Sequence, residues 1–403
     1  MVSILTRIFG TAHLQTAEDV VQDTLIQALQ VWKIKGIPEN PSGWIMAVAR
    51  NKAIDVIRRQ RHSVNFDFSD DRILLNSEYT LETTMDDLWK EEAIKDDMLR
   101  MMYACCHPGL SAENQITLVL KTLCGFSAGE IAAAFLTTED TVSKRLYRTK
   151  EYFRKEKIPM EIPPPDDLKE RTGAVLNSIY LLFNEGYSSA QGEDRIRKDL
   201  IGEAMLLCRM LADNPLTSDP RAWALLALMC FHASRNESRL GPEGEIILLP
   251  SQDRSRWDFR LIEEGNECMD RAASGEVVSP YHLEAAIAFE HCTAESFEAV
   301  NWKRILGYYE WLARIAPSPM IELNRIIVVM QVHGAAVAQA QLETLPEAGR
   351  FTAYSLYHAL RGEILLRMDY KPGARGAFEE AARLTQSVAE RRVLEEKIAA
   401  LAD

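Results

Sequence analysis

Three side chains with the chemistry to contact nucleic acid follow one another along a short stretch of the chain. Trp44, Asn51 and Arg58 are spaced by seven residues, about two turns of a helix, so a helix would place them on one face. An indole stacks on an unpaired base, an amide hydrogen-bonds a base edge and a guanidinium holds a phosphate. The pattern favours a nucleic-acid surface; in the alternative, Trp44 lies in the core and Asp55 pairs with Arg58 or Arg59.

A second candidate surface lies on a stretch with two helix starts. Ser127 and Glu130 have the spacing of a capping box, and Thr137 and Asp140 resemble a second one. Two helices joined by a tight turn form a helix-turn-helix unit, whose second helix needs a polar, cationic face to enter the major groove. The predicted core stripe of that helix contains Val142, Leu146, Thr149 and Phe153; the opposite stripe contains Asp140, Ser143, Lys144, Tyr147, Arg148 and Glu151. Arg145 is expected between the stripes, in a structural role.

A third stretch, residues 16–32, predicts a helix whose outward side suits a protein partner. Its core side is expected to contain Val21, Leu25, Ala28 and Trp32. The opposite side presents one isoleucine among acids and amides: Asp19, Gln22, Asp23, Ile26 and Gln30. An exposed apolar side chain surrounded by polar ones is typical of protein interfaces. A solvated face with one stray apolar residue is the alternative.

These surfaces need helices to position them, and the periodicity of the apolar residues predicts helices throughout. In the stretch that holds Trp44, the predicted core face contains Ile45, Val48, Ala49, Ala53, Val56 and Ile57. Ser279-Pro280 and Ser318-Pro319 each match an N-cap followed by proline at the first helical position. No alternating strand pattern persists beyond a few residues, so the expected fold class is all-α.

A polar stretch and a proline-rich stretch divide the helical pattern into domains. The predicted boundaries are a first helical domain over 1–64, a linker over 65–84, a second helical domain over 85–157, a proline-rich linker over 158–168 and a larger helical domain over 169–403. Proline removes a backbone donor and disfavours helix in the residue before it, so IPMEIPPPDD predicts a break.

Part of the tetratricopeptide pattern occurs near the end of the chain. Small and aromatic residues at fixed offsets let two antiparallel helices pack closely. The matching positions are Gly362, Leu365, Ala374, Phe378 and Ala381. No second copy matches as well, so the sequence predicts helix pairs without showing a regular array.

The chain of 403 residues has a net charge of −13, which as a single number argues against nucleic acid. The charge is, however, unevenly distributed. Residues 50–61 hold five cations against Asp55, and residues 144–157 hold seven against two acids, whereas residues 67–97 hold eleven acids and three bases. Two basic helices joined by an acidic tether predict local cationic surfaces. Two solvated helix faces and a linker are the alternative.

Cysteine usage and hydropathy predict a cytoplasmic protein. The seven cysteines have no CxxC spacing, so a reduced compartment is expected. Arg7 interrupts the apolar start too early for a signal peptide, and no stretch approaches the about 20 apolar residues of a membrane helix. Cys105, Cys106 and His107 could ligate a metal, but neighbours on a helix point in different directions. No second cluster stands at ligand spacing, so neither a metal nor a cofactor is expected.

The motif QDRSRWD has the composition of a catalytic site. It places Asp253, Arg254, Arg256 and Asp258 around Trp257. No pair of nucleophile and base accompanies these residues, and charged networks that cap helices have the same composition. A structural role or a regulatory interface is therefore the favoured interpretation.

The motif FNEGY stands at an expected helix end. Its polar residues Asn184, Glu185 and Tyr187 could line a groove that takes part in regulation. Capping of the helix through Gly186 is an equally good explanation.

Taken in order, the first three stretches resemble a known family. AEDVVQDTLIQAL, GWIMAVARNKAIDVIRR and EIAAAFLTTEDTVSKRLYRTKEYF resemble regions 2.2, 2.3–2.4 and 4.2 of extracytoplasmic-function (ECF) RNA polymerase sigma factors. MYACCHPGLS, LLFNEGYSSA and QDRSRWDFRLIEEG are similar to the group of these factors with a C-terminal tetratricopeptide-like extension. The resemblance implies two small helical sigma domains and a larger helical extension, with no enzymatic activity.

The resemblance also implies a task for each surface. The clamp of the largest subunit of core RNA polymerase would be bound by Asp19, Gln22, Asp23, Ile26 and Gln30. The flap of the polymerase is implied as a further contact of the chain. The −10 element of promoter DNA would be engaged by Trp44, Asn51, Arg58 and Arg59. The −35 element would be read by Ser143, Lys144, Tyr147 and Arg148. The extension would regulate activity through an intramolecular or protein partner, with Asn184, Glu185, Tyr187, Asp253, Arg254, Trp257 and Asp258 as its expected interface.

One departure and two other functions bear on this interpretation. Leu136 replaces the glycine usual in the helix-turn-helix, so the turn there must avoid a left-handed residue. A free-standing DNA-binding regulator with a sensing helical domain would not need the surface around Ile26. An enzyme with its active site in residues 252–265 would turn over a small molecule.

Overall fold

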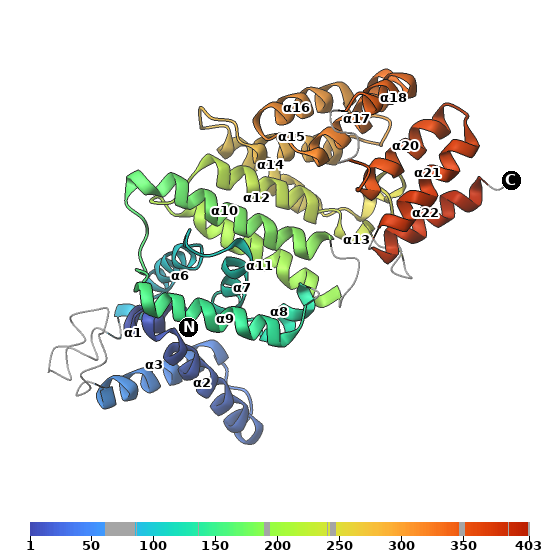
Figure 1. Cartoon of the computed structure of the whole chain (residues 1–403). Helices are drawn as coiled ribbons and strands as arrows, with labels where there is room; N and C mark the ends of the chain where they lie inside the picture. Colours follow the sequence, from blue (N-terminus) through green and yellow to red (C-terminus); the bar gives the residue numbers. More distant parts are fainter. Residues whose placement is uncertain are drawn as a thin grey trace. The chain divides into compact units, whose positions relative to one another are not determined.

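The structure is a computed structural model that describes residues 1–60, 85, 87–135, 137–188, 194–239, 241, 247–345, 351–385 and 387–401. Over these ranges the chain forms helices and no strands, which confirms the all-α prediction (Figure 1). No helix in these ranges has the length and apolarity to cross a membrane. The linker predicted over 65–84, most of the acidic tether, and Leu136 lie outside the described residues.

Contacts between helices divide the chain into two compact units. Unit 1 comprises Met1–Gly186 and Gly202–Thr217, and unit 2 comprises Tyr187–Ile201 and Ser218–Asp403. The helices up to the middle of the chain are α1 (Val2–Phe9), η1 (Thr11–His13), α2 (Leu14–Lys35), α3 (Pro41–Gln60), α6 (Glu91–Cys105), α7 (Ala112–Thr122), α8 (Ala128–Ala134), α9 (Glu139–Glu156), α10 (Pro165–Ser188) and α11 (Asp194–Asp213). The remaining helices are α12 (Pro220–Ala233), α13 (Asn236–Arg239), η2 (Leu249–Ser251), η3 (Arg254–Arg256), α14 (Phe259–Ala272), α15 (Pro280–Thr293), α16 (Trp302–Ile315), α17 (Pro319–His333), α18 (Ala335–Glu343), α20 (Ser355–Arg367), α21 (Lys371–Leu384) and α22 (Val388–Ala400).

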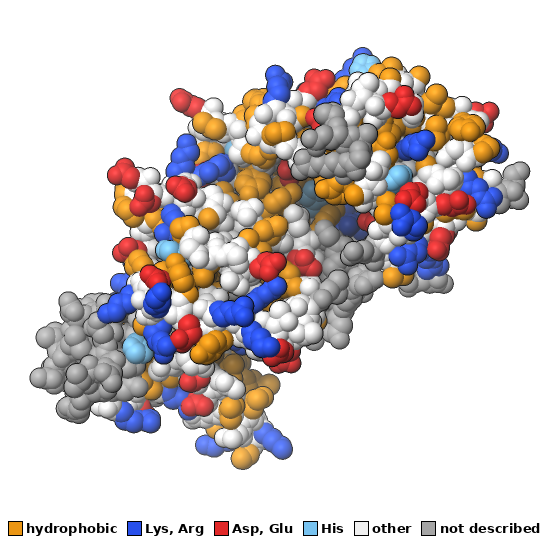
Figure 2. Space-filling model, in the orientation of Figure 1, with side chains coloured by type: hydrophobic (Ala, Val, Ile, Leu, Met, Phe, Trp, Pro, Cys, Tyr) orange, Lys and Arg blue, Asp and Glu red, His pale blue; other side chains and the backbone are white. Residues whose placement is uncertain are grey.

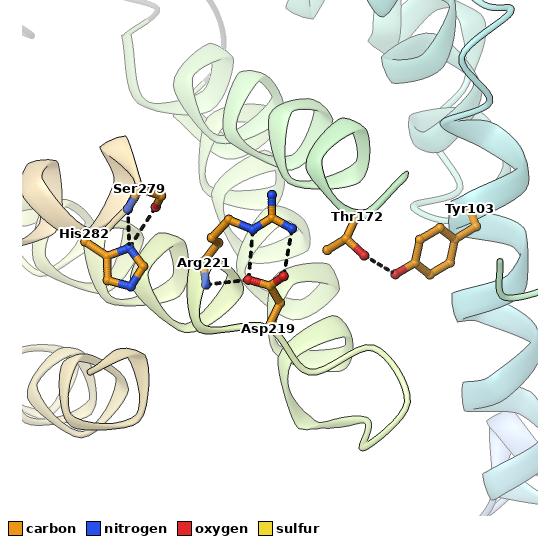
Figure 3. A network of polar contacts seen from close by, with 6 residues as sticks. All are labelled: Tyr103, Thr172, Asp219, Arg221, Ser279 and His282. Carbon is orange, nitrogen blue, oxygen red and sulfur yellow. Dashed lines mark hydrogen bonds and ion pairs between the residues drawn. The ribbon is translucent and has the colours of Figure 1, made fainter. Parts of the chain in front are cut away.

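The compact units do not divide at the proline-rich stretch. α10 begins at Pro165, and most of this helix clusters with the N-terminal helices. Tyr103 on α6 and Thr172 on α10 are buried and share a hydrogen bond of 2.8 Å between their hydroxyl oxygens (Figure 3). Arg171 donates from Nη2 to the Tyr103 carbonyl at 2.7 Å. α10 therefore contributes to the core of unit 1.

The first helices of unit 1 surround one apolar core. On α3, the predicted core residues Ala49, Ala53 and Ile57 are buried, and Ile54, which was not among them, is buried as well. The cluster consists of Ile4, Leu5, Ile8, Phe9, Ala17, Val20, Ala53, Ile54, Ile57, Met85 and Leu88. Burial of these side chains fixes the faces that α2 and α3 turn outward.

The buried side of α2 differs from the predicted one. Its buried residues are Leu14, Ala17, Val20, Thr24 and Ala28. The prediction of Leu25 as a core residue is wrong, because 43% of this side chain is exposed. Thr24 tolerates burial because its hydroxyl donates to the Val20 carbonyl at 2.7 Å. Val21 and Trp32 are half-buried.

Asp97 on α6 is a buried acid beside α1. Its Oδ1 lies 3.6 Å from Nη1 of Arg7. Burial raises the pKa of Asp97 to about 6, although the positive charges of Arg7 and Arg100 act in the opposite direction. This ion pair ties α6 to the first helix of unit 1.

Unit 2 contains helix pairs that pack at short distance. A Cβ added to Gly362 on α20 would lie 2.5 Å from the ring of Phe378 on α21. A Cβ added to Gly265 on α14 would lie 2.6 Å from the ring of Phe231 on α12. Both rings are fully buried, so only glycine fits at either position. The predicted close packing of the first pair is confirmed; the second pair was missed.

Side-chain caps fix the helix starts of unit 2. Asp219 accepts from the backbone N–H of Arg221 at 2.8 Å and also bonds the Arg221 guanidinium, which begins α12 (Figure 3). The N–H of Ser279 donates to Nδ1 of His282 at 3.1 Å at the start of α15. Ser279 and Ser318 are N-caps followed by proline, as predicted.

Candidate nucleic-acid interface

The two stripes of α9 lie where the sequence predicted them. Val142, Leu146, Thr149 and Phe153 are buried. The four residues expected to read the −35 element are all exposed: Ser143, Lys144, Tyr147 and Arg148. Tyr147 has 66% of its surface exposed, which is unusual for a large aromatic side chain. Figure 2 shows Lys and Arg side chains along this helix with acidic ones between them.

Caps define the two helices that carry this surface. Ser127 and Glu130 form the predicted capping box at the start of α8. The second predicted box is wrong by one residue: Thr138, not Thr137, is the N-cap of α9, and its hydroxyl accepts from the N–H of Thr141 at 3.2 Å. Thr138 takes this role because its backbone is extended directly before the first helical residue.

Ion pairs restrain part of the α9 surface. Lys144 lies 2.6 Å from Asp140, and both side chains are largely exposed, so water and salt screen the pair. Arg145 lies 2.7 Å from Glu113 of α7, which agrees with its predicted structural role. Lys144 therefore remains available to a phosphate or a base edge, whereas Arg145 is directed to the protein.

The far end of α9 contacts α2. Nζ of Lys150 lies 2.6 Å from Glu18 and 2.8 Å from Gln15. Lys150 has 19% of its side chain exposed and Glu18 13%, so this pair is shielded from solvent. Thr11 also donates to the carbonyl of Ile158, just beyond α9. Sequence patterns did not predict this contact, because Lys150 is one of seven cations in its stretch.

The residues predicted for the second nucleic-acid surface share α3. Asn51, Arg58 and Arg59 are exposed, and Trp44 is half-buried with its ring centroid 5.6 Å from that of Trp32 on α2. Arg58 lies 3.6 Å from Asp55, so the alternative that Asp55 pairs with a neighbouring arginine is confirmed. Trp44 therefore has a structural contact as well as an accessible part.

The outward side of α2 is more apolar than predicted. Asp19, Gln22, Asp23, Ile26 and Gln30 are exposed, as expected. Leu25 and Leu29 join Ile26 on the exposed part of the helix, with 43%, 72% and 45% of their surfaces accessible. Ile34 and Ile37 are exposed beyond them. Several large apolar side chains at one place indicate a protein-binding surface rather than one stray residue.

The QDRSRWD segment caps helices in unit 2. Asp253 accepts from the N–H and hydroxyl of Ser255, and these hydrogen bonds lower the pKa of its carboxyl. Asp258 accepts from the N–H groups of Arg260 and Leu261 at the start of α14. This bears out the interpretation of Asp253 and Asp258 as helix caps.

The FNEGY segment does not end its helix. α10 continues to Ser188, so the interpretation of Gly186 as a C-cap is wrong. Asn184 and Glu185 are half-buried, and burial raises the pKa of Glu185. The hydroxyl of Tyr187 lies 3.2 Å from Nδ1 of His232. The sequence pointed to Gly186 because glycine is common after helices, but here it is buried within one.

Cys105 and Cys106 are packed in the core of unit 1. Sγ of Cys105 lies 3.4 Å from the Thr122 hydroxyl. Burial raises the pKa of both thiols, for Cys106 to about 11. Both sulfurs are therefore protonated at neutral pH and have a structural role.

Comparisons with known proteins concern both halves of the chain. Residues 1–63 match Sigma-70 region 2, and residues 171–273 match a family of unknown function (DUF6596). An uncharacterized protein of Rhizobium meliloti (strain 1021) is 35% identical over 378 residues, 94% of this chain and 88% of that protein. The ECF RNA polymerase sigma factor SigL of Mycobacterium tuberculosis is 33% identical over 138 residues, 34% of this chain and 72% of SigL. No solved structure matches the chain.

The stretch that matches Sigma-70 region 2 contains α1, α2 and α3. These helices carry the exposed apolar side of α2 and the surface around Asn51. The match, the similarity to most of SigL and the all-α fold agree with one another. The chain belongs to the family of ECF RNA polymerase sigma factors.

Proposed function

We propose that this sigma factor binds core RNA polymerase and directs it to a specific class of promoters. The observation that carries the proposal is the exposed cationic side of α9, with Lys144 and Arg148 outward above a fully buried stripe. A surface of this kind on a capped helix suits the major groove. In this proposal α8 and α9 form a helix-turn-helix that reads the −35 element through Ser143, Lys144, Tyr147 and Arg148.

The other two surfaces have complementary tasks in the proposal. Asn51, Arg58 and Arg59 of α3, with the accessible part of Trp44, engage the −10 element as it melts. The exposed side of α2, centred on Ile26, binds the clamp of the largest polymerase subunit, and the flap is a further contact. No step in this mechanism requires catalysis by the chain. Its binding to the polymerase and to the promoter is sufficient to place the polymerase at the promoter.

The experiment begins by mapping promoters, through sequencing of the transcripts induced by overexpression. Transcription in vitro with core polymerase then compares a mapped promoter with one carrying an altered −35 element. Lys144→Ala is expected to reduce discrimination between them by about 1–3 kcal/mol, the contribution of one good base contact. Lys155→Ala is the matched control, because Lys155 is 83% exposed near the other end of α9. Unchanged −35 selectivity in Lys144→Ala would refute the assigned surface.

A free-standing DNA-binding regulator is the competing function. It would bind its DNA without core polymerase and would not co-purify with it. The exposed apolar side of α2 supports the sigma factor instead, because a regulator that acts alone has no need of it.

We further propose that the helical extension regulates activity. The structure guides the truncation that examines this, because most of α10 and the segment Gly202–Thr217 belong to unit 1. A chain ending near Pro163 would lose the contacts of Arg171 and Thr172 with Tyr103. A chain ending at Thr217 keeps them, so a change in its transcription relative to the full-length chain would come from the loss of residues 218–403, which are most of unit 2. Equal transcription by the full-length chain and the chain ending at Thr217, in vitro and in cells, would rule out regulation by residues 218–403.

A further inference from the structure

A cluster of buried hydrogen-bond donors lies in unit 2, apart from the surfaces assigned to DNA and polymerase. It is built around the indole of Trp257, which is 4% exposed. Arg254 lies over this ring, 4.4 Å from Cζ to the ring centroid, and Arg235 lies 6.0 Å from the same centroid. His291 belongs to the cluster through the carbonyl that it offers to Arg254.

Part of each arginine is fixed by the protein. Nη1 of Arg254 donates to the carbonyls of His291 at 2.9 Å and Ala294 at 2.7 Å. Nη2 of Arg235 lies 3.0 Å from both the Tyr187 hydroxyl and Nδ1 of His232. The guanidinium groups are therefore held in place before any ligand arrives, which reduces the entropy lost on binding.

The remaining donors have nothing to bond to. Nε of Arg235, Nη2 of Arg254, Nε1 of Trp257 and Nδ1 of His291 are buried, and no acceptor in the described part of the chain reaches them. Arg235 is itself 9% exposed. A buried N–H without an acceptor costs about 1–3 kcal/mol, and more when the group is charged. Such a set of atoms calls for an acceptor that the described residues do not supply.

The two arginines of the cluster lack a direct carboxylate partner among the described residues. Neither Arg235 nor Arg254 forms an ion pair with a described carboxylate. Burial, reinforced by the positive charge of these two arginines, lowers the pKa of His291 to about 4. The histidine is therefore neutral, and the two guanidinium groups leave the cluster positively charged, with the exposed carboxylate of Glu298 as an electrostatic neighbour of Arg254.

We propose that Arg235, Arg254 and Trp257 form a binding site for a small oxyanion, a molecule that carries a phosphate or a carboxylate group. An acceptor with several oxygens has enough lone pairs for donors from two guanidinium groups and an indole, and a negative charge offsets theirs. All three residues lie within the stretch 171–273 that matches the family of unknown function. The site would allow the extension to bind a ligand, and this proposal does not depend on how the other helices contact DNA.

The experiment observes the Trp257 indole directly in the full-length chain. Tryptophan is labelled with ¹⁵N, and the Trp257 signal is assigned from its loss in Trp257→Phe. Titration with inorganic phosphate, with malonate and with sodium chloride at matched ionic strength separates a phosphate, a dicarboxylate and a salt effect. The site predicts a saturable shift of the Trp257 signal with phosphate, malonate or both, and none with chloride.

Variants then connect the shift to the arginines. Arg254→Gln and Arg254→Lys are both expected to weaken binding by about tenfold or more, the effect of one charge-assisted hydrogen bond. The lysine variant keeps the charge and guards against misfolding of the glutamine variant. Arg256→Gln is the matched control, because Arg256 is exposed in the same segment and should bind as the natural chain does.

Three results would overturn the site. One is a Trp257 signal that does not shift in any titration of the folded chain, which would mean that water serves these donors. Another is an equal shift with chloride. The third is an affinity that both Arg254 variants retain, because the shift would then come from an adventitious ion elsewhere.

Discussion

Helices α2 and α9 belong to the same compact unit and differ chiefly in what they expose. Each buries a regular stripe against its neighbours. The exposed side of α2 carries Leu25, Ile26 and Leu29 among acids and amides, whereas that of α9 carries Lys144, Arg148 and a tyrosine. The outward stripe of each helix therefore sets the kind of partner that the helix suits. An apolar surface suits a protein, and a cationic surface suits DNA.

The largest effect is expected on α2. The double substitution Ile26→Asp and Leu29→Asp should weaken binding of core polymerase by about 100-fold or more, because central apolar contacts carry most of the binding energy of an interface. The affinity is measured with purified core enzyme. Leu216→Asp is the control, since Leu216 is 68% exposed in the same unit but not on α2. Equal affinities for the double variant and the control would mean that α2 faces solvent in the complex.

A smaller effect is expected on α9. Arg148→Gln should weaken binding of promoter DNA by about 1–3 kcal/mol and reduce the slope of log affinity against log salt by about one if Arg148 holds a phosphate. The measurement is affinity of the polymerase complex over a salt series. Arg154→Gln is the control on the same helix, where Arg154 pairs with Glu151. If Arg154→Gln loses as much affinity for promoter DNA as Arg148→Gln does, the overall positive charge of α9 explains the binding and the assigned stripe does not.

The contact between the two helices gives the next effect. Lys150→Met removes the shielded bond to Glu18 and should lower the free energy of unfolding by about 1–2 kcal/mol, since the carboxylate loses its partner. Thermal unfolding followed by circular dichroism measures this. Lys155→Met, at an exposed cation of the same helix, should change little. Equal free energies of unfolding for the two variants would show that the Lys150–Glu18 bond does not hold α9 to α2 in solution.

The smallest effect is expected at Asp55. Asp55→Asn removes an exposed ion pair with Arg58 and should change the free energy of unfolding by less than about 0.5 kcal/mol. Transcription in vitro should also remain unchanged, because Asp55 then only restrains Arg58. A loss of −10 selectivity would instead place Asp55 itself at the DNA.

The sequence predicted both stripes of α9, although not its N-cap, and predicted the buried side of α2 only in part, for a physical reason. On α9, apolar residues alone mark the buried stripe, apart from Thr149, which bonds the Arg145 carbonyl. On α2, Thr24 replaces an apolar residue in the core by bonding the helix backbone, and Leu25 is left outside. Hydrophobic periodicity by itself favours Leu25 over a threonine, whose burial depends on a hydroxyl that is satisfied within its own helix.

Contacts between distant segments were the other part that sequence patterns could not predict. The pair Gly362 and Phe378 was found because a known pattern spaces them closely. Gly265 and Phe231 make the same kind of contact. Here the aromatic residue comes before the glycine in the sequence and the two are farther apart along the chain, so no such pattern matches them. The bonds of Lys150 and the unpartnered donors around Trp257 likewise depend on the folded arrangement alone.

The bond between Lys150 and Glu18 has a consequence for where the free factor resides. If this contact has to separate before α9 lies along a duplex, it divides the molecules into closed and open populations. If about one molecule in a hundred is open, its apparent affinity for a −35 element falls about a hundredfold below the intrinsic value. Matching sites on the chromosome would then stay vacant in the presence of unbound factor, and occupancy would follow the supply of core polymerase rather than that of the factor.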